Sequence, residues 1–162
     1  MKNFPIIDKE TGREYWISRS VAVVVAVFTK NSVLVIQRGK GTPDPEYVDK
    51  YCLPCGYLDF DETCVQAAQR ELKEETGLTF PISDFKLVSI NDIPNSDKRQ
   101  NITFRFRTEL GGYIDDWELS DKFSETNEVS DIKWIDLREI NNYKWAFGHE
   151  KIITEIKESN KN

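Results

Sequence analysis

Residues 64–76 have the periodicity of an amphipathic helix with three carboxylates on one face, and residues 59–63 are interpreted as its entry. Each residue of an α-helix advances about 100°, so Glu75 lies about 40° to one side of Glu71 and Glu74 about 60° to the other. Like charges at this spacing destabilise a helix by about 0.2–0.5 kcal/mol per pair. We therefore expect a cation to compensate these glutamates, although a solvated acidic surface helix would have the same composition.

The chemistry of these side chains indicates which cation to expect. Carboxylate oxygens are hard ligands, and at this density they suit Mg²⁺ or Mn²⁺ better than zinc. Magnesium keeps several water molecules and usually binds a few carboxylates together with the phosphates of a substrate. The acidic face is therefore a candidate Mg²⁺ or Mn²⁺ site.

The spacing around this helix resembles the signature of the Nudix hydrolases. Gly56 and Glu62 precede the run RELKEETGL at residues 70–78, and together they match the Nudix box at every defined position. A pattern defined at so many positions carries far more information than a lone glycine motif. We therefore expect a Nudix-type α/β/α sandwich with a mixed β-sheet, built from residues 1–162 as a single Nudix hydrolase domain.

The resemblance implies a metal site and part of the catalytic machinery. The carboxylates of Glu71, Glu74 and Glu75, joined by the carbonyl of Gly56, correspond to the metal ligands. Glu71, Glu74 and Arg70 are candidate catalytic residues, and Glu71 or Glu75 is also expected to orient the attacking water.

Three further positions of the box are expected to have structural roles. Arg70 is predicted to hold the carboxylate of Glu62 through its two-pronged guanidinium, a geometry that arginine forms better than lysine. Leu72 is predicted to pack the helix on the sheet. Gly77 follows the last helical turn, where a positive φ angle favours glycine.

The general base is less constrained by the box. In many members of the family it is one of the box glutamates, and in others it comes from a loop nearer the C-terminus. Glu125 and Glu128 lie just before the predicted strand at residues 129–135. Glu128 is our preferred candidate, and the alternative is that both are solvated acids of a loop.

Two segments outside the box bear on the substrate. Residues 92–99 (DIPNSDKR) resemble the D-x-P-x-R-D-x-R segment of ADP-ribose pyrophosphatase-like members. Residues 145–152 (WAFGHEKI) resemble their terminal A-F-D-H-x-x-I. Two positions depart from these patterns: Ser96 replaces an arginine and Gly148 replaces an aspartate. The substrate is therefore less narrowly defined, because the arginine of the pattern would be a contact for phosphate or ribose.

Candidate substrate contacts follow from these segments and the strand after them. They are Pro94, Asp97 and Arg99, with Lys98 and Arg105 as weaker candidates for contact with phosphate. An arginine in a surface loop would be an equally good interpretation of Arg99. The lone histidine, His149, is interpreted as a structural hydrogen-bonding residue, and the C-x-x-C at residues 52–55 as a turn at the end of a strand.

The expected activity is metal-dependent hydrolysis of the pyrophosphate bond of a nucleoside diphosphate linked to another group, with ADP-ribose or a nucleoside diphosphate sugar as the best guess. One alternative is a pyrophosphohydrolase of (d)NTPs or of RNA 5′ ends. Another is a Nudix domain that senses ADP-ribose without turnover. Loss of metal-dependent turnover in glutamate-to-glutamine variants would separate an enzyme from a sensor.

Net charge, apolar runs and cysteine content restrict the partners and the compartment to be expected. The net charge of −6 disfavours a broad electrostatic grip on nucleic acid. No apolar run reaches the roughly 18–20 residues that a membrane span needs, and the N-terminus lacks the apolar core of a signal peptide. Three cysteines suit reduced thiols. We therefore expect a cytoplasmic protein that binds a small nucleotide.

The remaining elements are predicted from periodicity. Residues 18–29 contain the apolar run VAVVVAVF, which predicts a strand buried on both faces. Strands are also expected at 33–38, 84–92, 101–110 and 129–135, and helices at 136–140 and 146–158. Residues 1–14 are polar and turn-rich, and residues 1–16 are interpreted as an N-terminal extension or dimer-contact segment, because the resemblance implies a homodimer.

Overall fold

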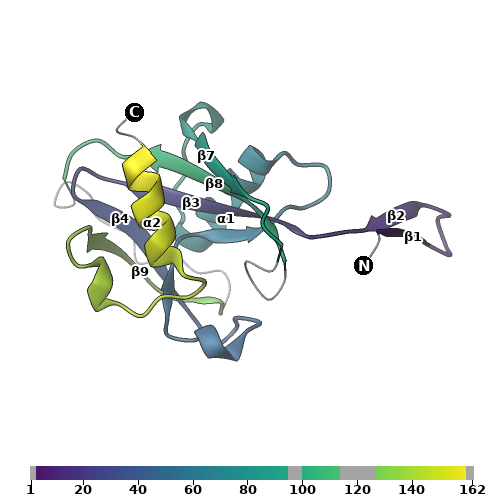
Figure 1. The fold of residues 1–162 in the computed structure, drawn as a ribbon, viewed down its shortest axis with the longest axis horizontal. Helices are drawn as coiled ribbons and strands as arrows, with labels where there is room; N and C mark the ends of the chain where they lie inside the picture. Colours follow the sequence, from purple (N-terminus) through teal and green to yellow (C-terminus); the bar gives the residue numbers. More distant parts are fainter. Residues whose placement is uncertain (1–2, 95–99, 114–126, 160–162) are drawn as a thin grey trace.

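The computed structural model describes residues 3–94, 100–113 and 127–159, and it has the mixed sheet between two helices that the sequence predicts (Figure 1). In chain order the strands are β1 (Phe4–Ile7), β2 (Glu14–Ile17), β3 (Val21–Phe28), β4 (Ser32–Arg38), β5 (Tyr51–Cys52), β6 (Cys55–Tyr57), β7 (Lys86–Asn91), β8 (Ile102–Glu109) and β9 (Val129–Asp136). The helices are α1 (Cys64–Thr76) and α2 (His149–Glu158), with short 3₁₀ turns η1 (Pro45–Tyr47), η2 (Ile82–Asp84) and η4 (Ile140–Asn142).

Within the described residues, seven strands share one sheet in the order β5-β4-β3-β8-β7, with β6 also paired to β3 and β9 to β4. β3 and β8 run parallel over their full length, from the pair Val21 and Ile102 to the pair Phe28 and Glu109. The other pairings in this sheet are antiparallel. The mixed sheet is therefore confirmed.

The central strand β3 is buried on both faces, as its uninterrupted apolar run predicts. Val23, Val25 and Val27 pack in a cluster that includes Leu72 of α1. The alternate residues of β3 pack in a second cluster, which includes Ile153 of α2. Because successive side chains of a strand point to opposite faces, the two helices cover opposite faces of the sheet. This arrangement confirms the α/β/α sandwich (Figure 1).

Local interactions define where helix α1 begins and where it ends. The backbone N–H of Gln66 donates to the hydroxyl of Thr63, and the side chain of Gln66 accepts from the backbone N–H of Thr63, which completes a capping box. Gly77 follows the helix with a φ of 72°. The helix begins at Cys64, directly after the entry predicted at residues 59–63, where Asp61 has a φ of 66° that no α-helix accommodates.

The C-terminal helix and strand β8 also differ in detail from the prediction. Helix α2 begins at His149 rather than at residue 146, because Phe147 and Gly148 have φ angles of 58° and 68°. Strand β8 alternates as expected: Phe106 packs with the α1 cluster, whereas Arg105 pairs with Glu155 of α2. The short helix predicted to start at residues 136–140 is wrong, since β9 extends to Asp136 and only the 3₁₀ turn η4 follows.

The N-terminal residues form an antiparallel hairpin that projects away from the sandwich (Figure 1). Within the polar, turn-rich residues 1–14 the sequence analysis predicted no strand, yet Phe4–Ile7 pair with Glu14–Ile17. The periodicity of FPII is obscured by its proline, a residue typical of edge strands. Trp16 and Ile7 are exposed in this hairpin. Its role in a dimer stays a prediction.

The helices of the described residues are short and amphipathic. Neither α1 nor α2, nor any shorter helical turn there, has the length and apolar character that crossing a bilayer requires.

Leu72 should dominate the attachment of α1 to the sheet, because its side chain is fully buried. We expect Leu72→Ala to lower the free energy of unfolding by about 2–5 kcal/mol, through lost apolar burial and the cavity left behind. The neighbouring residue Lys73 is exposed and provides the control. Lys73→Ala should change the free energy of unfolding by no more than about 0.5 kcal/mol. Urea denaturation measures both; equal losses in the two variants would contradict this packing.

Candidate active site

A cleft of about 1030 Å³ lies between α1, strands β6 and β8, and the first turn of α2. The predicted metal ligands Gly56, Glu71, Glu74 and Glu75 all line it, and so does Glu128. Residues far apart in the sequence thus meet at one place. The cleft is the candidate active site.

Glu71 lies directly against the backbone of strand β6. A Cβ atom added to Gly56 would clash with the carboxylate of Glu71, so a side chain at position 56 would displace that glutamate. Burial raises the pKa of Glu71, although Arg70 acts in the opposite direction. The carboxylate is therefore partly desolvated and lacks full charge compensation from the protein.

Arg70 connects the start of the box to its acidic face. Its Nε donates to Oε2 of Glu62 at 3.2 Å and its Nη2 to Oε1 at 2.7 Å, which is the fork that the sequence predicts. Its Nη1 donates to Glu71 at 2.7 Å and to Glu74 at 3.2 Å. The hydrogen bond from Arg70 lowers the pKa of Glu62. One guanidinium therefore holds three carboxylates of the box.

Glu75 is the most buried of the three glutamates, with 7% of its surface exposed. Its Oε2 accepts from the backbone N–H of Cys55 at 2.8 Å, and its Oε1 accepts from Nη1 of Arg38 at 3.4 Å. Burial raises the pKa of Glu75 well above its usual range, and the neighbouring Glu71 adds to the effect. A cation in the cleft would offset this cost.

Arg38, which sequence reasoning missed, ends strand β4 and points into the cleft. Its guanidinium donates to Oγ1 of Thr42 at 3.1 and 2.6 Å, besides its bond to Glu75. Its Nη2 also lies 3.8 Å from Oε2 of Glu128. The only signal in the sequence was a charged residue at the end of an apolar strand, directly before a glycine-containing loop.

The backbone around Glu128 is held by the loop that follows β4. The N–H of Gly39 donates to the carbonyl of Glu128 at 2.6 Å, and the N–H of Gly41 to the carbonyl of Asn127 at 2.8 Å. A Cβ atom at either glycine would clash with Asn127, so the approach requires glycine. Of our two loop candidates for the base, Glu128 thus faces the cleft, whereas Glu125 lies outside the described residues.

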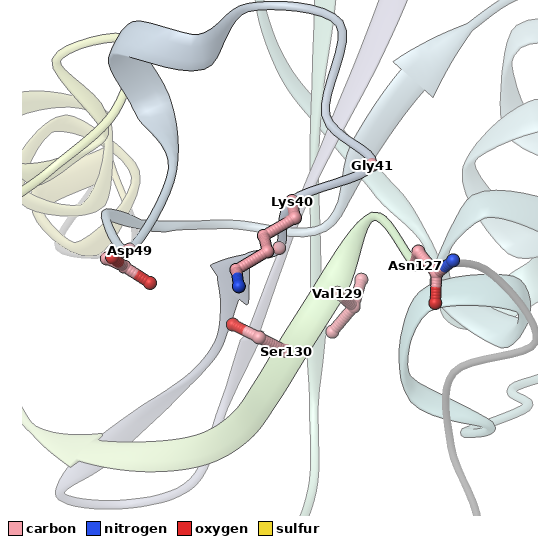
Figure 2. A pocket seen from close by; sticks show the side chains of 7 residues that line it. Lys40, Gly41, Asp49, Asn127, Val129 and Ser130 are labelled. Atoms are coloured by element: carbon pink, nitrogen blue, oxygen red, sulfur yellow. The ribbon is translucent and has the colours of Figure 1, made fainter.

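A smaller hollow of about 540 Å³ lies beside the same loop. Figure 2 shows Lys40 and Ser130 facing it, with Asp49 and Asn127 at its margins. Its lining contains none of the box residues and a single carboxylate. It therefore lacks the donor set that phosphoanhydride hydrolysis needs.

The donor set of the cleft fits a hard divalent cation. It offers the carboxylates of Glu71, Glu74 and Glu75 and the carbonyl of Gly56, which are oxygen ligands throughout. In the described part of the chain, the three carboxylates do not converge to within 4.8 Å of one another. Arg70 instead pairs with Glu71 and Glu74, and Arg38 pairs with Glu75.

A second cluster, Cys52, Cys55 and His149, does converge within that distance. The backbone N–H of Leu53 donates to Nδ1 of His149 at 3.0 Å, which leaves the proton of the neutral ring on Nε2. Neither nitrogen then offers a lone pair to a metal. His149 is therefore the structural hydrogen-bonding residue that we predicted, and the C-x-x-C spans the bend from β5 to β6.

The predicted substrate contacts are distributed unevenly. Arg105 lines the cleft, where its Nη1 pairs with Glu155 at 2.6 Å. Pro94 is exposed and does not belong to the lining, so its contact with a substrate stays a prediction. Asp97 and Arg99 lie outside the described residues, as do Ser96 and Lys98.

Comparison with known proteins gives a consistent result. The family model described as "NUDIX domain" matches residues 18–156. The ADP-ribose pyrophosphatase of Methanocaldococcus jannaschii is 31% identical over 152 residues, which cover 91% of this chain and 80% of that protein.

Solved structures of other proteins share the fold. The NUDIX domain of Shewanella oneidensis NrtR, complexed with ADP ribose, superimposes with a TM-score of 0.72 at 23% identity, over 88% of each chain. A bifunctional NMN adenylyltransferase/ADP ribose pyrophosphatase from Francisella tularensis, complexed with AMP and a manganese ion, gives a TM-score of 0.70 at 26% identity. That match covers 87% of this chain and 42% of the other.

The pH dependence of stability should report the burial of His149. Desolvation, aided by the charges of Arg105 and Arg38, lowers the pKa of His149 to about 3 from an ordinary value of 6.5. Below pH 6.5 the unfolded chain binds a proton that the folded chain does not, so stability present above pH 6.5 is lost as the pH falls toward 3. The slope is about 1.4 kcal/mol per pH unit.

The variant His149→Asn keeps an acceptor for the N–H of Leu53 but cannot titrate. We expect it to be less stable at pH 7 and to lose less stability than the wild type between pH 6.5 and pH 4.5. Urea denaturation at several pH values measures the difference. Parallel curves for the two proteins would show that His149 is not buried as a neutral ring.

Proposed function

The chain belongs to the Nudix family of pyrophosphohydrolases, and we propose that it hydrolyses the pyrophosphate bond of ADP-ribose or a similar nucleoside diphosphate sugar with a divalent cation. The observation that carries the proposal is the meeting of the box glutamates, Arg38 and Glu128 in one cleft. The cleft volume of about 1030 Å³ lies at the upper end for ligand sites. The name of the relative from Methanocaldococcus jannaschii supports the same substrate class.

Mg²⁺ or Mn²⁺ would be held by Glu71, Glu74 and Glu75 together with the carbonyl of Gly56. When bound, it supplies the positive charge that offsets the negative oxygens of the pyrophosphate. The donor set is the support for this assignment, because it consists of oxygen ligands and two of its glutamates have pKa values raised by burial.

The chain's own residues would prepare the site before substrate arrives. Arg70 holds Glu71 and Glu74 from the box side, while Arg38 and the N–H of Cys55 hold Glu75. These contacts fix the three carboxylates at the cleft before the reaction, which is a form of preorganisation. Arg105 lines the cleft from strand β8, where it is paired with Glu155. It would contact a phosphate or ribose of the substrate in place of Glu155.

Glu128 is our proposal for the general base. Its side chain is about half exposed, and Arg38 lies near enough to orient it. It would take a proton from a water molecule as the water oxygen attacks one phosphorus of the pyrophosphate. The P–O bond to the bridging oxygen breaks, and the products are a nucleoside monophosphate and a sugar phosphate.

Substrate and metal are tested together by phosphate release from a panel containing ADP-ribose, UDP-glucose, diadenosine polyphosphates, dNTPs and NADH. A phosphatase converts monophosphate products to phosphate. We expect cleavage selective for ADP-ribose that a chelator abolishes. Glu71→Gln should lower kcat by at least about a hundredfold, whereas Glu109→Gln, outside the cleft, should match the wild type.

Two outcomes would contradict this proposal. Preference for dNTPs would assign the chain to nucleoside triphosphates. Binding of ADP-ribose without any turnover, in Mg²⁺ and in Mn²⁺, would make the domain a sensor.

The role of Glu128 is tested separately. We expect Glu128→Gln to lower kcat by about 10²–10⁴-fold with little change in KM, because the amide cannot accept a proton. Glu139→Gln, an exposed residue away from the cleft, is the control. A kcat like that of the wild type would instead assign the base to a box glutamate.

A further inference from the structure

Two aromatic side chains from distant parts of the chain meet in the lining of the cleft. Tyr47 ends the turn η1, and Phe147 immediately precedes the residues that begin α2. Their ring centroids lie 4.3 Å apart at an angle of 54°. Both side chains line the same cleft as the box glutamates. Neither residue is explained by the metal site or by the catalytic roles proposed above.

The backbone of Phe147 is in an unfavourable conformation. Its φ of 58° lies in the left-handed region, where a bulky residue other than glycine is an outlier. Such conformations persist only when the surrounding structure imposes them, and they cluster at ligand sites. Glycine or asparagine would adopt this conformation at a lower cost, so a phenylalanine here indicates that its ring has a role.

The neighbours of Phe147 explain how the conformation is imposed. The N–H of Ala146 donates to the carbonyl of Tyr51 at 2.8 Å, and Ala146 is fully buried. Two residues after Phe147, His149 is anchored by the N–H of Leu53. The chain is therefore fixed on both sides of a two-residue turn, and the ring of Phe147 is presented outward from it.

Packing alone does not account for this ring. Phe147 contacts Tyr47 and lies 5.4 Å from the ring of His149, yet 40% of its surface stays exposed. A residue selected for core packing would be buried, as Ala146 and His149 are on either side. An exposed aromatic face inside a ligand cleft is a surface on which a planar group can stack.

We propose that Phe147, supported by Tyr47, is the platform on which the nucleobase of the substrate stacks. The inference rests on the proposed function, because it assigns the base-binding part of the same cleft. Stacking of a base on an aromatic ring needs no hydrogen-bond donors and tolerates different bases. Lys50, with Nζ 5.3 Å from the centroid of Tyr47, further restrains the supporting ring.

The test compares two mononucleotide-sized ligands that differ in the base. AMP carries a base and ribose 5-phosphate does not, and isothermal titration calorimetry measures the dissociation constant of each for the full chain. We expect wild-type protein to bind AMP more tightly. Phe147→Leu should weaken AMP binding by about ten- to hundredfold and leave ribose 5-phosphate unchanged, because leucine keeps apolar area but has no aromatic face.

Two further variants make the result specific. Phe147→Trp keeps a stacking face, so it should retain the preference for AMP. Phe60→Leu removes an aromatic ring that is 76% exposed outside the cleft, so it should behave as the wild type. If Phe147→Leu preserves the ratio of the two dissociation constants, the platform is wrong.

The outcomes separate this inference from the proposed function. Loss of AMP preference in Phe147→Leu, in a protein that cleaves no compound of the panel, would support the platform and contradict the hydrolase proposal. Normal cleavage of ADP-ribose with an unchanged KM in Phe147→Leu would support the hydrolase proposal and contradict the platform.

A stability measurement guards against a folding artefact. Phe147→Gly removes the ring and also relieves the left-handed strain, whereas Phe147→Ala removes the ring and keeps the strain. We expect the glycine variant to melt at a higher temperature than the alanine variant, and both to lose the AMP preference. A glycine variant that is folded and still prefers AMP would overturn the proposal.

Discussion

The junction between helix α1 and strand β6 is the contact on which the candidate site depends. The carboxylate of Glu71 occupies the space that a side chain at Gly56 would fill, and Glu75 accepts the N–H of the adjacent Cys55. Both glutamates are thereby desolvated, which raises their pKa values. The helix packs through Leu72, and that apolar burial holds two carboxylates in a position that electrostatics alone would disfavour.

Two arginines make this arrangement tolerable. Arg70 comes from the same helix and restrains the box from one side. Arg38 comes from strand β4 and connects Glu75 to Glu128, the latter fixed by the loop after β4. Because partnered charges can be buried where isolated ones cannot, these pairs allow acidic groups to collect in one cleft. A cation would complete the compensation that the arginines begin.

The aromatic part of the cleft also depends on the core, which here maintains a strained backbone conformation instead of buried charges. Phe147 keeps an unfavourable φ angle because its neighbours Ala146 and His149 are anchored in the core. The stability of the sandwich therefore maintains a locally costly feature at its surface. Charged and aromatic groups reach the same cleft from α1, β4, η1 and the start of α2.

Much of this protein was determined by the sequence itself. The two-sided burial of β3, the capping box and positive φ angle that bound α1, and the Arg70–Glu62 pair all follow from periodicity or from residues close in the chain. The strand at Phe4–Ile7 was missed and the start of α2 was placed too early, because a proline and two left-handed residues interrupt the local pattern. Only the tertiary structure brought Arg38 to Glu75, Glu128 to the box helix, and Tyr47 to Phe147. Such contacts depend on how distant elements pack, which no local pattern encodes.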